Sequence, residues 1–371
     1  MYKVLVFGVT ENPGGVESFL LSYYRKIDRT KIQFDFLCNT HNRVAYEDEL
    51  LSLGGRVIHI AMRSREPVRY RKELNDFMRK HASEYQAVWV NVCSLANIDY
   101  LIIAKKYGIQ KRIIHSHNSQ NMEGFLRKTL HQFNRGRIEK YATDFWACSE
   151  DAAKWFYKDS LLSQSVIIKN AIDLSRVSFS EEKRKAIRNQ YQLSDAFVLG
   201  NVGRLHFQKN QSFALDVMSC LIRKMPNAVL MLVGQGEDEE KLKARAEELK
   251  VTDHVIFTGV QSDIRGYLSA FDIFLFPSKF EGLSISGLEA QANGLTTLAS
   301  YGVIPEDLKL EDNFYFKKLE DGAESWAEEI LDLSRNLKRA DPEIVRERFT
   351  RAGFNIDTEA RRLENLLMEK S

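Results

Sequence analysis

The stretch FVLGNVGRLHFQKNQSFALDVMSCLIR, residues 197–223, decides the fold, because it places a complete strand–loop–helix unit in the middle of the chain. Its apolar start at residues 197–202 predicts a buried strand, and residues 211–223 predict an amphipathic helix. Similar elements follow it: strands at 228–233, 255–258 and 272–276, and a helix at 238–249. This alternation predicts a parallel sheet with helices on both faces.

The same alternation occupies the first half of the chain. Strands are predicted at 3–7, 33–37, 56–60, 87–90 and 112–115, and helices at 16–26, 69–82, 95–107 and 123–141. A charged interval without strands, residues 174–195, separates the two series, and the tail 341–371 reads as two helices. We therefore predict an α/β protein of two doubly wound domains, 1–172 and 173–354.

The bulk properties indicate a soluble protein that stays in the cytoplasm. A chain of 371 residues suits two domains. Its four widely spaced cysteines predict free thiols in a reducing compartment. The N-terminus lacks the features of a signal peptide, and no run approaches the ~18 apolar residues of a membrane-spanning helix.

Charge is unevenly distributed along the chain. Residues 1–170 hold 26 Lys and Arg against 18 Asp and Glu, a balance of +8, and the remainder holds 27 against 33, or −6, which sums to the net +2. One interpretation is variation between solvated faces. The other is that the first half meets an anionic surface or a phosphorylated acceptor.

Two loops in the first half carry candidate ligand-binding groups. Gly14 and Gly15 open a helix, whose free N–H groups could hold a phosphate, although a plain helix start explains them equally; Glu17 favours the helix dipole whatever the function. His115 and His117 in HSHN project the same way if the strand continues. A metal site, a hydrogen bond to sugar or phosphate, and a structural histidine pair all remain open.

Two loops in the second half carry cations and glycines. Gly203 allows a tight turn, and Arg204 and Lys209 after it suit a diphosphate, with a solvated face as the alternative. Asn210 is a candidate N-cap for the next helix. Backbone groups beside Val260 could read a base.

The stretch FEGLSISGLEAQANG, residues 280–294, places Glu281 and Glu289 eight positions apart with no charge between them. We predict a helix start near Ser284, with Glu281 in the preceding loop and Glu289 inside the helix. Paired glycosidase carboxylates sit about 5–10 Å apart, which disfavours a hydrolase pair at this spacing. Two spread carboxylates suit a clamp on one extended ligand.

These motifs together resemble the retaining glycosyltransferase family 4. The resemblance rests on GGVESF, VGRLHFQKN, VGQGEDEEKLK, VIFTGV and the E-x7-E of Glu281 and Glu289, in that order over nearly the whole chain. Within the family, the chain most resembles the glycosyltransferases of bacterial capsule and exopolysaccharide operons. The segments that carry this resemblance are KIQFDFLCN, IIHSHN, ACSED, IIKNAID and SWAEEI.

The resemblance implies a GT-B fold, with two Rossmann-like domains facing across a cleft and a C-terminal helix, about 355–371, packed back on the first. It implies a hexosyltransferase-type enzyme (EC 2.4) that takes a sugar from a nucleotide diphosphate donor, most often UDP-linked, and retains its anomeric configuration. The acceptor would be a saccharide or a polyprenyl-diphosphate-linked saccharide. Neither a metal, a cofactor nor nucleic acid is expected.

The resemblance also implies residue roles. Arg204 and Lys209 would neutralise the diphosphate, Glu281 would contact donor-sugar hydroxyls, and Glu289 the ribose. Donor binding would further involve the remaining residues around the loops: Gly203, Val260, Gly282, Leu283 and Ser284. His115 would lie near the transferred sugar, with His117 as second choice. The acceptor side would be bordered by Gly14, Gly15, His117 and Asn118.

The sequence departs from the family pattern at three places. The segment after the second glutamate, ASYGVIPEDLKL, is short of glycines, and IPNGID appears as IIKNAID, with Lys169 and Ala171 in place of proline and glycine. An HxH expected after the fourth strand is NVCS, residues 91–94. This last change makes acceptor recognition hard to transfer.

Three rivals to a transferase remain. They are a sugar-nucleotide epimerase of the same fold, a non-catalytic partner subunit of another glycosyltransferase, and a nicotinamide enzyme. The last is disfavoured because no GxGxxG follows a strand.

The basic stretch FLRKTLHQFNRGRIEK, residues 125–140, suits either a solvated helix or a surface that rests on anionic lipid. The second interpretation predicts peripheral attachment at the inner membrane face.

Overall fold

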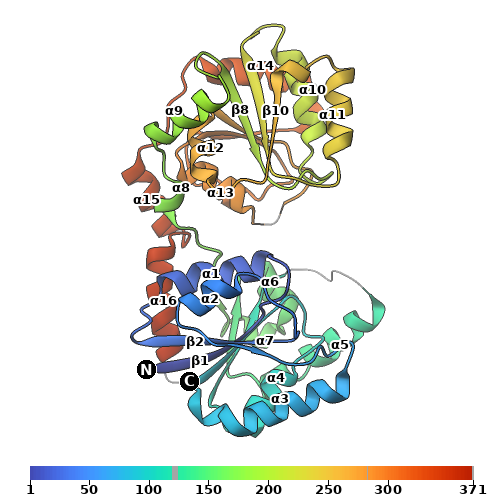
Figure 1. The fold of residues 1–371 in the computed structure, drawn as a ribbon, viewed down its shortest axis with the longest axis vertical. Helices are drawn as coiled ribbons and strands as arrows, with labels where there is room; N and C mark the ends of the chain where they lie inside the picture. The colour runs from blue at the N-terminus through green and yellow to red at the C-terminus, as the bar shows by residue number, and fades with distance from the viewer. Residues whose placement is uncertain (119–123, 282, 370–371) are drawn as a thin grey trace. The chain divides into compact units, whose positions relative to one another are not determined.

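The apolar runs of the first half form a seven-stranded sheet in the order β3-β2-β1-β4-β5-β6-β7, with every pair parallel (Figure 1). The computed structural model describes residues 1–118, 124–281 and 283–369. The strands of this sheet are β1 (Tyr2–Phe7), β2 (Ile32–Cys38), β3 (Val57–His59), β4 (Ala87–Val92), β5 (Lys111–Ser116), β6 (Asp144–Ala147) and β7 (Val166–Ile167). Chain order reverses between β1 and β4, where open parallel sheets bind ligands.

Helices cover both faces of this first sheet. They are α1 (Gly15–Lys26), α2 (Glu47–Ser52), α3 (Pro67–His81), α4 (Asp99–Lys106), α5 (Phe125–Arg135), α6 (Glu150–Phe156), α7 (Asp159–Leu162) and α16 (Ile356–Met368). Apolar residues of α1, α2 and α16 pack on one face around Trp89 and Trp146. Those of α3, α4 and α6 pack on the other.

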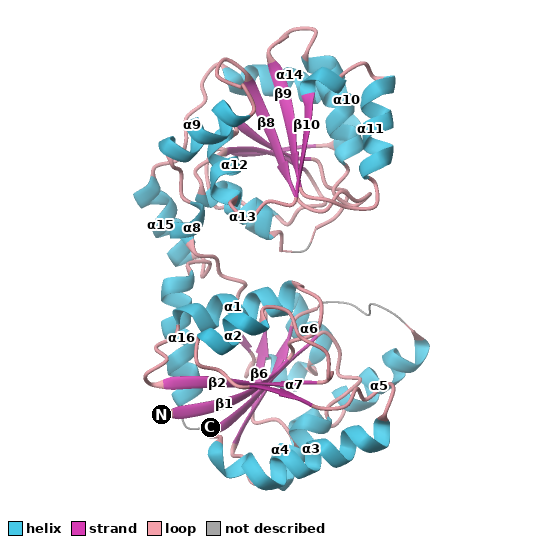
Figure 2. Ribbon diagram, in the orientation of Figure 1, coloured by secondary structure: helices cyan, strands magenta, loops and turns pink. Residues whose placement is uncertain are grey.

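The second half repeats the design with a six-stranded sheet in the order β10-β9-β8-β11-β12-β13 (Figure 2). Its strands are β8 (Phe197–Val202), β9 (Ala228–Val233), β10 (Val255–Gly259), β11 (Ile273–Phe276), β12 (Thr296–Ser300) and β13 (Phe314–Lys317). Its helices are α8 (Leu174–Val177), α9 (Glu181–Gln190), α10 (Gln211–Leu221), α11 (Glu239–Glu248), α12 (Ile264–Ala270), α13 (Ile285–Ala292), α14 (Gly322–Ser334) and α15 (Pro342–Arg351). Here the order reverses between β8 and β11.

The chain divides into two units at Ala171 and again at Asn355. The first unit holds residues 1–171 and the C-terminal segment from Ile356, and the second holds residues 172–355. The two predicted tail helices are confirmed as α15 and α16. Because α16 buries Ile356, Ala360 and Leu363 in the core beside β1, the last helix completes the core of the first unit.

Most predicted elements are confirmed to within two residues, and the differences have local causes. The helix predicted at 95–107 begins only at Asp99, since residues 95–96 form a turn and residues 97–98 are irregular. The helix predicted at 123–141 ends at Arg135 and gives way to a 3₁₀ turn, Ile138–Lys140; its first residue, Glu123, lies outside the described residues. Sequence reasoning missed four short strands, β6, β7, β12 and β13.

Candidate functional site

The loops after β8 and β11 lie side by side at the reversal point of the second sheet. Lys279 N donates to the Gln208 carbonyl at 2.8 Å, and Gln208 Nε2 donates to the Phe280 carbonyl at 3.0 Å. Asn210 was predicted to cap α10, and it does stand at the N-cap position. Its side chain instead donates to the Pro277 carbonyl at 3.0 Å, and its backbone is left-handed with φ 55°. These contacts hold the two loops as one surface.

Lys209 and Glu281 meet on this surface. Lys209 Nζ lies 2.7 Å from Glu281 Oε1, and Ser278 Oγ donates to the same oxygen at 2.7 Å. The exposed fractions are 17% for the Lys209 side chain and 6% for that of Glu281, so the pair is largely shielded from water. A shielded, charge-assisted hydrogen bond fixes both groups in place.

Arg204 lies apart from this pair. Its guanidinium Nη2 is 2.9 Å from Glu237 Oε2 after β9, and its side chain is 69% exposed. His206 Nε2 lies 3.3 Å from the other oxygen of Glu237. The Glu237 pKa is lowered, first by a hydrogen bond from its own backbone and then by the charge of Arg204. Glu237 therefore holds the cation that sequence reasoning assigned to a diphosphate.

Glycines allow the β8 and β9 loops to pack against each other. A Cβ on Gly234 would lie 2.1 Å from the Gly203 carbonyl oxygen, and one on Gly236 would lie 2.1 Å from the Leu205 carbonyl oxygen. Gly203 itself has φ +154° and lies against the Lys209 side chain. In this structure these glycines serve loop packing, which places Lys209 at the strand ends.

The start of α13 follows directly after the Lys209–Glu281 pair. The helix begins next to Ser284, as predicted. Ser284 is its N-cap, and its hydroxyl accepts from Gly287 N at 3.4 Å. Leu283 is partly exposed in front of it, while Gly282 lies outside the described residues. The free N–H groups of this first turn can bind an anion.

Glu289 lies inside α13 with its side chain partly buried. Burial raises the pKa of its carboxyl to about 7. Among the residues that the structure describes, no hydrogen bond or ion pair engages this carboxylate. A half-buried acid without a partner suits contact with a polar ligand such as a pair of hydroxyl groups.

Val260 follows β10 and is 66% exposed. The preceding Gly259 has φ +67° and forms a bridge with Gly234, which ties this turn to the β9 loop. The structure thus brings the β8, β9, β10 and β11 loops of the second unit to the same edge of its sheet.

In the first unit, Gly14 and Gly15 stand at the start of α1 as predicted. Gly14 is the N-cap residue and makes no side-chain cap, and Gly15 begins the helix. A Cβ on Gly15 would meet nothing within 4 Å among the described residues, so this helix start is sterically open. Glu17 is buried and accepts from Thr10 N at 3.0 Å and Thr10 Oγ1 at 2.6 Å. Glu17 therefore closes the loop before α1. Its position in the first turn of the helix does not by itself predict this contact with Thr10.

The two histidines share one face of the first sheet but differ in depth. His115 lies within β5, is fully buried, and stacks on Trp89 with 12° between the ring planes. Burial lowers its pKa well below the usual value, the neighbouring His117 lowers it further, and a backbone hydrogen bond at Ala147 acts in the opposite direction. A side chain without exposed surface cannot contact substrate in this conformation, so the structure does not support His115 as a substrate contact.

His117 follows the end of β5 and is partly exposed, as is Asn118. Burial of its ring lowers the His117 pKa to about 3, so the imidazole is neutral at pH 7. Of the two histidines, the predicted second choice is therefore the one placed to meet a ligand. Across the described ranges, no group of three or more His, Cys, Asp or Glu side chains is arranged to hold a metal ion.

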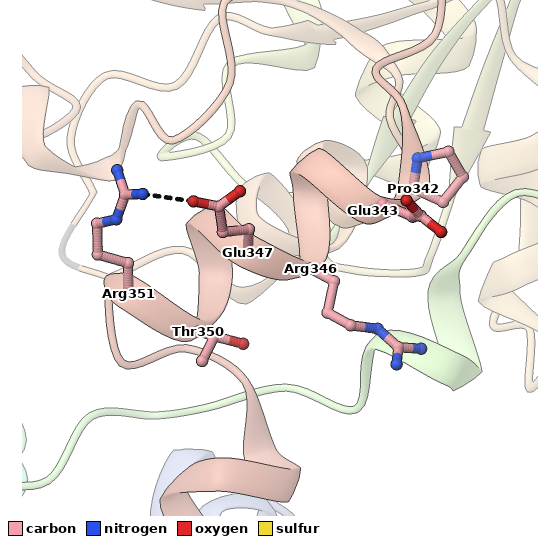
Figure 3. A pocket seen from close by; sticks show the side chains of 6 residues that line it. All are labelled: Pro342, Glu343, Arg346, Glu347, Thr350 and Arg351. Carbon is pink, nitrogen blue, oxygen red and sulfur yellow. Dashed lines mark hydrogen bonds and ion pairs between the residues drawn. The ribbon is translucent and has the colours of Figure 1, made fainter.

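A hollow of about 720 Å³ on α15 contains none of these residues (Figure 3). Its lining is formed by one stretch of helix: Pro342, Glu343, Arg346, Glu347, Thr350 and Arg351. Arg351 and Glu347 form an ion pair within the helix at 2.5 Å. The charges there belong to a solvated helix face.

Sequence reasoning missed three groups that shape the two edges: Ser278, Glu237 and Asn91. Ser278 and Glu237 act through contacts between loops far apart in the sequence, so no local pattern marks them. Asn91 appeared only as a departure from the expected HxH. Its Oδ1 lies 2.9 Å from His117 Nε2.

Two Rossmann-like units with polar loops at the reversal point of each sheet define a GT-B protein. Residues 183–353 match the family model for glycosyl transferases group 1. The chain is 30% identical over 297 residues to the Bacillus subtilis (strain 168) protein EpsF, which is named as a glycosyltransferase; the match covers 78% of this chain and 76% of EpsF. The chain belongs to the group 1 glycosyltransferase family, and it is an enzyme of the transferase class.

A second relative and a solved structure extend the comparison. An Escherichia coli UDP-Gal:alpha-D-GlcNAc-diphosphoundecaprenol alpha-1,3-galactosyltransferase is 30% identical over 138 residues, 36% of each chain. The crystal structure of Anabaena Alr3699/HepE in complex with UDP superposes with a TM-score of 0.78 at 17% identity, covering 99% of both chains. The second likeness establishes the fold.

Proposed function

We propose that this protein is a retaining family 4 glycosyltransferase that moves a sugar from a UDP-sugar to a saccharide or lipid-linked saccharide during exopolysaccharide or capsule synthesis. The observation that carries the proposal is the edge of the second sheet. There the Lys209–Glu281 pair lies on neighbouring loops, and α13 follows with its first turn and with Glu289, whose carboxylate has no partner among the described residues. The UDP in the HepE structure and the name of the Escherichia coli galactosyltransferase support the donor and acceptor classes, and the name of EpsF supports a glycosyltransferase.

Each donor-site group has a chemical task in this proposal. Lys209 and the first turn of α13 neutralise the diphosphate, together with Arg204 once it leaves Glu237. Glu281 accepts hydroxyls of the donor sugar, and Glu289 accepts those of the ribose. Backbone groups along the nucleotide come from Gly203, Val260, Leu283 and Ser284.

The reaction is a front-face substitution. An acceptor hydroxyl oxygen forms a bond to the anomeric carbon on the face from which the phosphate leaves. The electron pair of the broken carbon–oxygen bond goes to the phosphate oxygen, which also receives the hydroxyl proton. No side chain has to act as a strong base, and the residues proposed here require neither a metal nor a cofactor.

The decisive experiment screens UDP- and GDP-sugars for thermal stabilisation and then follows UDP release and sugar transfer with the best donor. We expect stabilisation by a UDP-sugar, transfer only when an acceptor is present, and a product with the donor's anomeric configuration. A changed sugar nucleotide without acceptor would identify an epimerase. Failure to bind any nucleotide diphosphate would favour a non-catalytic partner subunit.

The proposal includes a peripheral site at an anionic membrane surface, carried by α5. Phe125 and Phe133 on this helix are 88% and 61% exposed. Residues 125–140 hold five basic side chains and one acidic, a balance of +4, and the Arg137 guanidinium lies 5.1 Å from the centre of the Phe133 ring. Exposed aromatic rings beside basic groups suit the interface of an anionic bilayer. Among the described helices, none is long and apolar enough to cross a membrane.

Liposome flotation tests this attachment. We expect the protein to float with phosphatidylglycerol vesicles, to stay in solution with phosphatidylcholine vesicles, and to dissociate as salt rises, because exposed charges are screened. Phe125→Ser combined with Phe133→Ser should abolish flotation. Val68→Ser removes an equally exposed apolar side chain, 82% exposed on α3, and should leave flotation unchanged. Equal flotation with both kinds of vesicle, or unchanged flotation of the double α5 variant, would exclude α5 as the membrane-binding surface.

A further inference from the structure

Asn91 is a buried polar residue on β4, 1% exposed, that the proposed reaction does not use. It lies opposite His115 of β5 in the sheet register. A Cβ on the neighbouring Gly8 would come within 2.7 Å of the Asn91 Cβ and carbonyl oxygen, so the end of β1 passes close to this residue. The backbone of Asn91 is thus held by strands on both sides.

The orientation of the Asn91 amide follows from two contacts. Its Nδ2 faces the Trp89 carbonyl oxygen at 3.4 Å, and its Oδ1 lies 2.9 Å from His117 Nε2. A carbonyl oxygen only accepts hydrogen bonds, so the amide group facing it must be the NH₂. The oxygen that faces His117 can accept and cannot donate, which requires a hydrogen on Nε2.

The second ring nitrogen of His117 then carries a lone pair. A neutral imidazole has one N–H, and burial keeps this imidazole neutral by lowering its pKa to about 3. The ring is fixed by Phe19 and His115, whose ring centres lie 4.8 Å and 4.2 Å away. Within the described part of the chain, no hydrogen bond engages Nδ1, and His117 is partly exposed.

We propose that Asn91 is a positioning residue that fixes His117 as the Nε2–H tautomer, so that Nδ1 accepts a hydrogen bond from a hydroxyl group of the substrate sugar. The ligand in this assignment rests on the proposed function. The tautomer rests on the two contacts of the Asn91 amide and on the burial that keeps the His117 ring neutral. It gives the NVCS segment, the departure from the family pattern, a role through Asn91. A substrate with a group that cannot donate a hydrogen bond in place of that hydroxyl would lose the contact, because the Nδ1 lone pair cannot bond to another acceptor.

The tautomer is measured in the full-length protein without substrate. Two-bond ¹H–¹⁵N correlation of ¹⁵N-histidine-labelled protein at pH 8 distinguishes the two neutral tautomers, and His117→Gln assigns the signal among the eight histidines. We expect Nε2–H for wild type and for Asn91→Asp, whose carboxylate also accepts, and a mixture for Asn91→Leu, which has no acceptor. An Nδ1–H or charged ring in wild type, or an unchanged tautomer in Asn91→Leu, overturns the proposal.

Turnover provides the second readout. With UDP-glucose, or the UDP-sugar found by the donor screen, kcat/KM of Asn91→Leu should fall about 10- to 100-fold, the loss typical of a misplaced contact group. Asn91→Asp should stay within a few-fold of wild type. A merely structural role would lower both variants alike and would not follow the tautomer. If no donor is turned over at all, the tautomer result still stands, so failure of the function and failure of this inference are distinguishable.

Discussion

Replacing Lys209 with alanine is expected to lower kcat/KM for sugar transfer by about 100- to 1,000-fold, the usual cost of removing one preorganised group that stabilises developing charge. Lys209 is shielded, lies 2.7 Å from Glu281 Oε1, and stands at the strand ends where the diphosphate is proposed to bind. Its loss removes a positive charge from the leaving group and leaves Glu281 with Ser278 as its remaining hydrogen-bond donor among the described side chains. Steady-state UDP release measures the effect.

Stability separates the two roles of Lys209. The alanine variant should also lose about 1–3 kcal/mol of unfolding free energy, because the shielded Glu281 carboxylate loses its hydrogen bond from Lys209. The double variant Lys209→Met with Glu281→Gln removes both charges and should recover stability without recovering transfer. Lys241→Ala serves as the control and should change neither quantity, because the Lys241 side chain is 81% exposed in its ion pair with Asp238. Normal transfer by Lys209→Ala would remove this residue from the site.

Replacing Glu289 with glutamine is expected to stabilise the protein above pH 7 and to abolish tight donor binding. Burial raises the pKa of the Glu289 carboxyl from 4.5 to about 7, so the folded state binds a proton at pH values where the unfolded chain has released it. The unfolding free energy therefore falls as pH rises from 4.5 to 7, by about 3 kcal/mol in total. Glutamine carries no charge and escapes this loss.

Thermal unfolding at two pH values measures the effect. At pH 8 the Glu289→Gln variant should melt several degrees above wild type, and at pH 4.5 the two should agree. Glu240→Gln, on a side chain that is 87% exposed, should show no such pH-dependent gain. Equal melting at both pH values, or unchanged donor stabilisation in the variant, would contradict a buried carboxylate held for ligand binding.

The alternation of strands and helices was predictable because long apolar runs such as residues 197–202 and 228–233 are buried on both faces and read as continuous hydrophobic segments. The strands that escaped prediction lack this signal. β7 has two residues, and β12, TTLAS, begins with threonines. Such strands form because a neighbouring strand has free N–H and C=O groups with which they can pair. The local sequence contains no signal for this pairing.

The candidate site was predictable residue by residue but not as a geometry. Lys209 and Glu281 were both identified, yet their pairing depends on the order β8-β11 in the sheet, which joins loops 72 residues apart. The spacing of His115 and His117 predicted a shared face, and their rings do lie 4.2 Å apart. The spacing did not predict how deeply each ring is buried. Because β5 continues through Ser116, His115 lies within the strand and His117 lies beyond its end.

The placement of α16 means that the core of the first unit is completed by residues that are translated after the whole second unit. Lys111 at the start of β5 donates to the carbonyl oxygens of Leu366 and Glu369 at 2.7 and 2.8 Å, and Leu363 and Leu367 are fully buried beside α1. During synthesis, part of the apolar surface of the first unit therefore stays uncovered until the second unit and α16 have been translated. A chain cut between the second unit and α16 would therefore lose part of the core of the first unit.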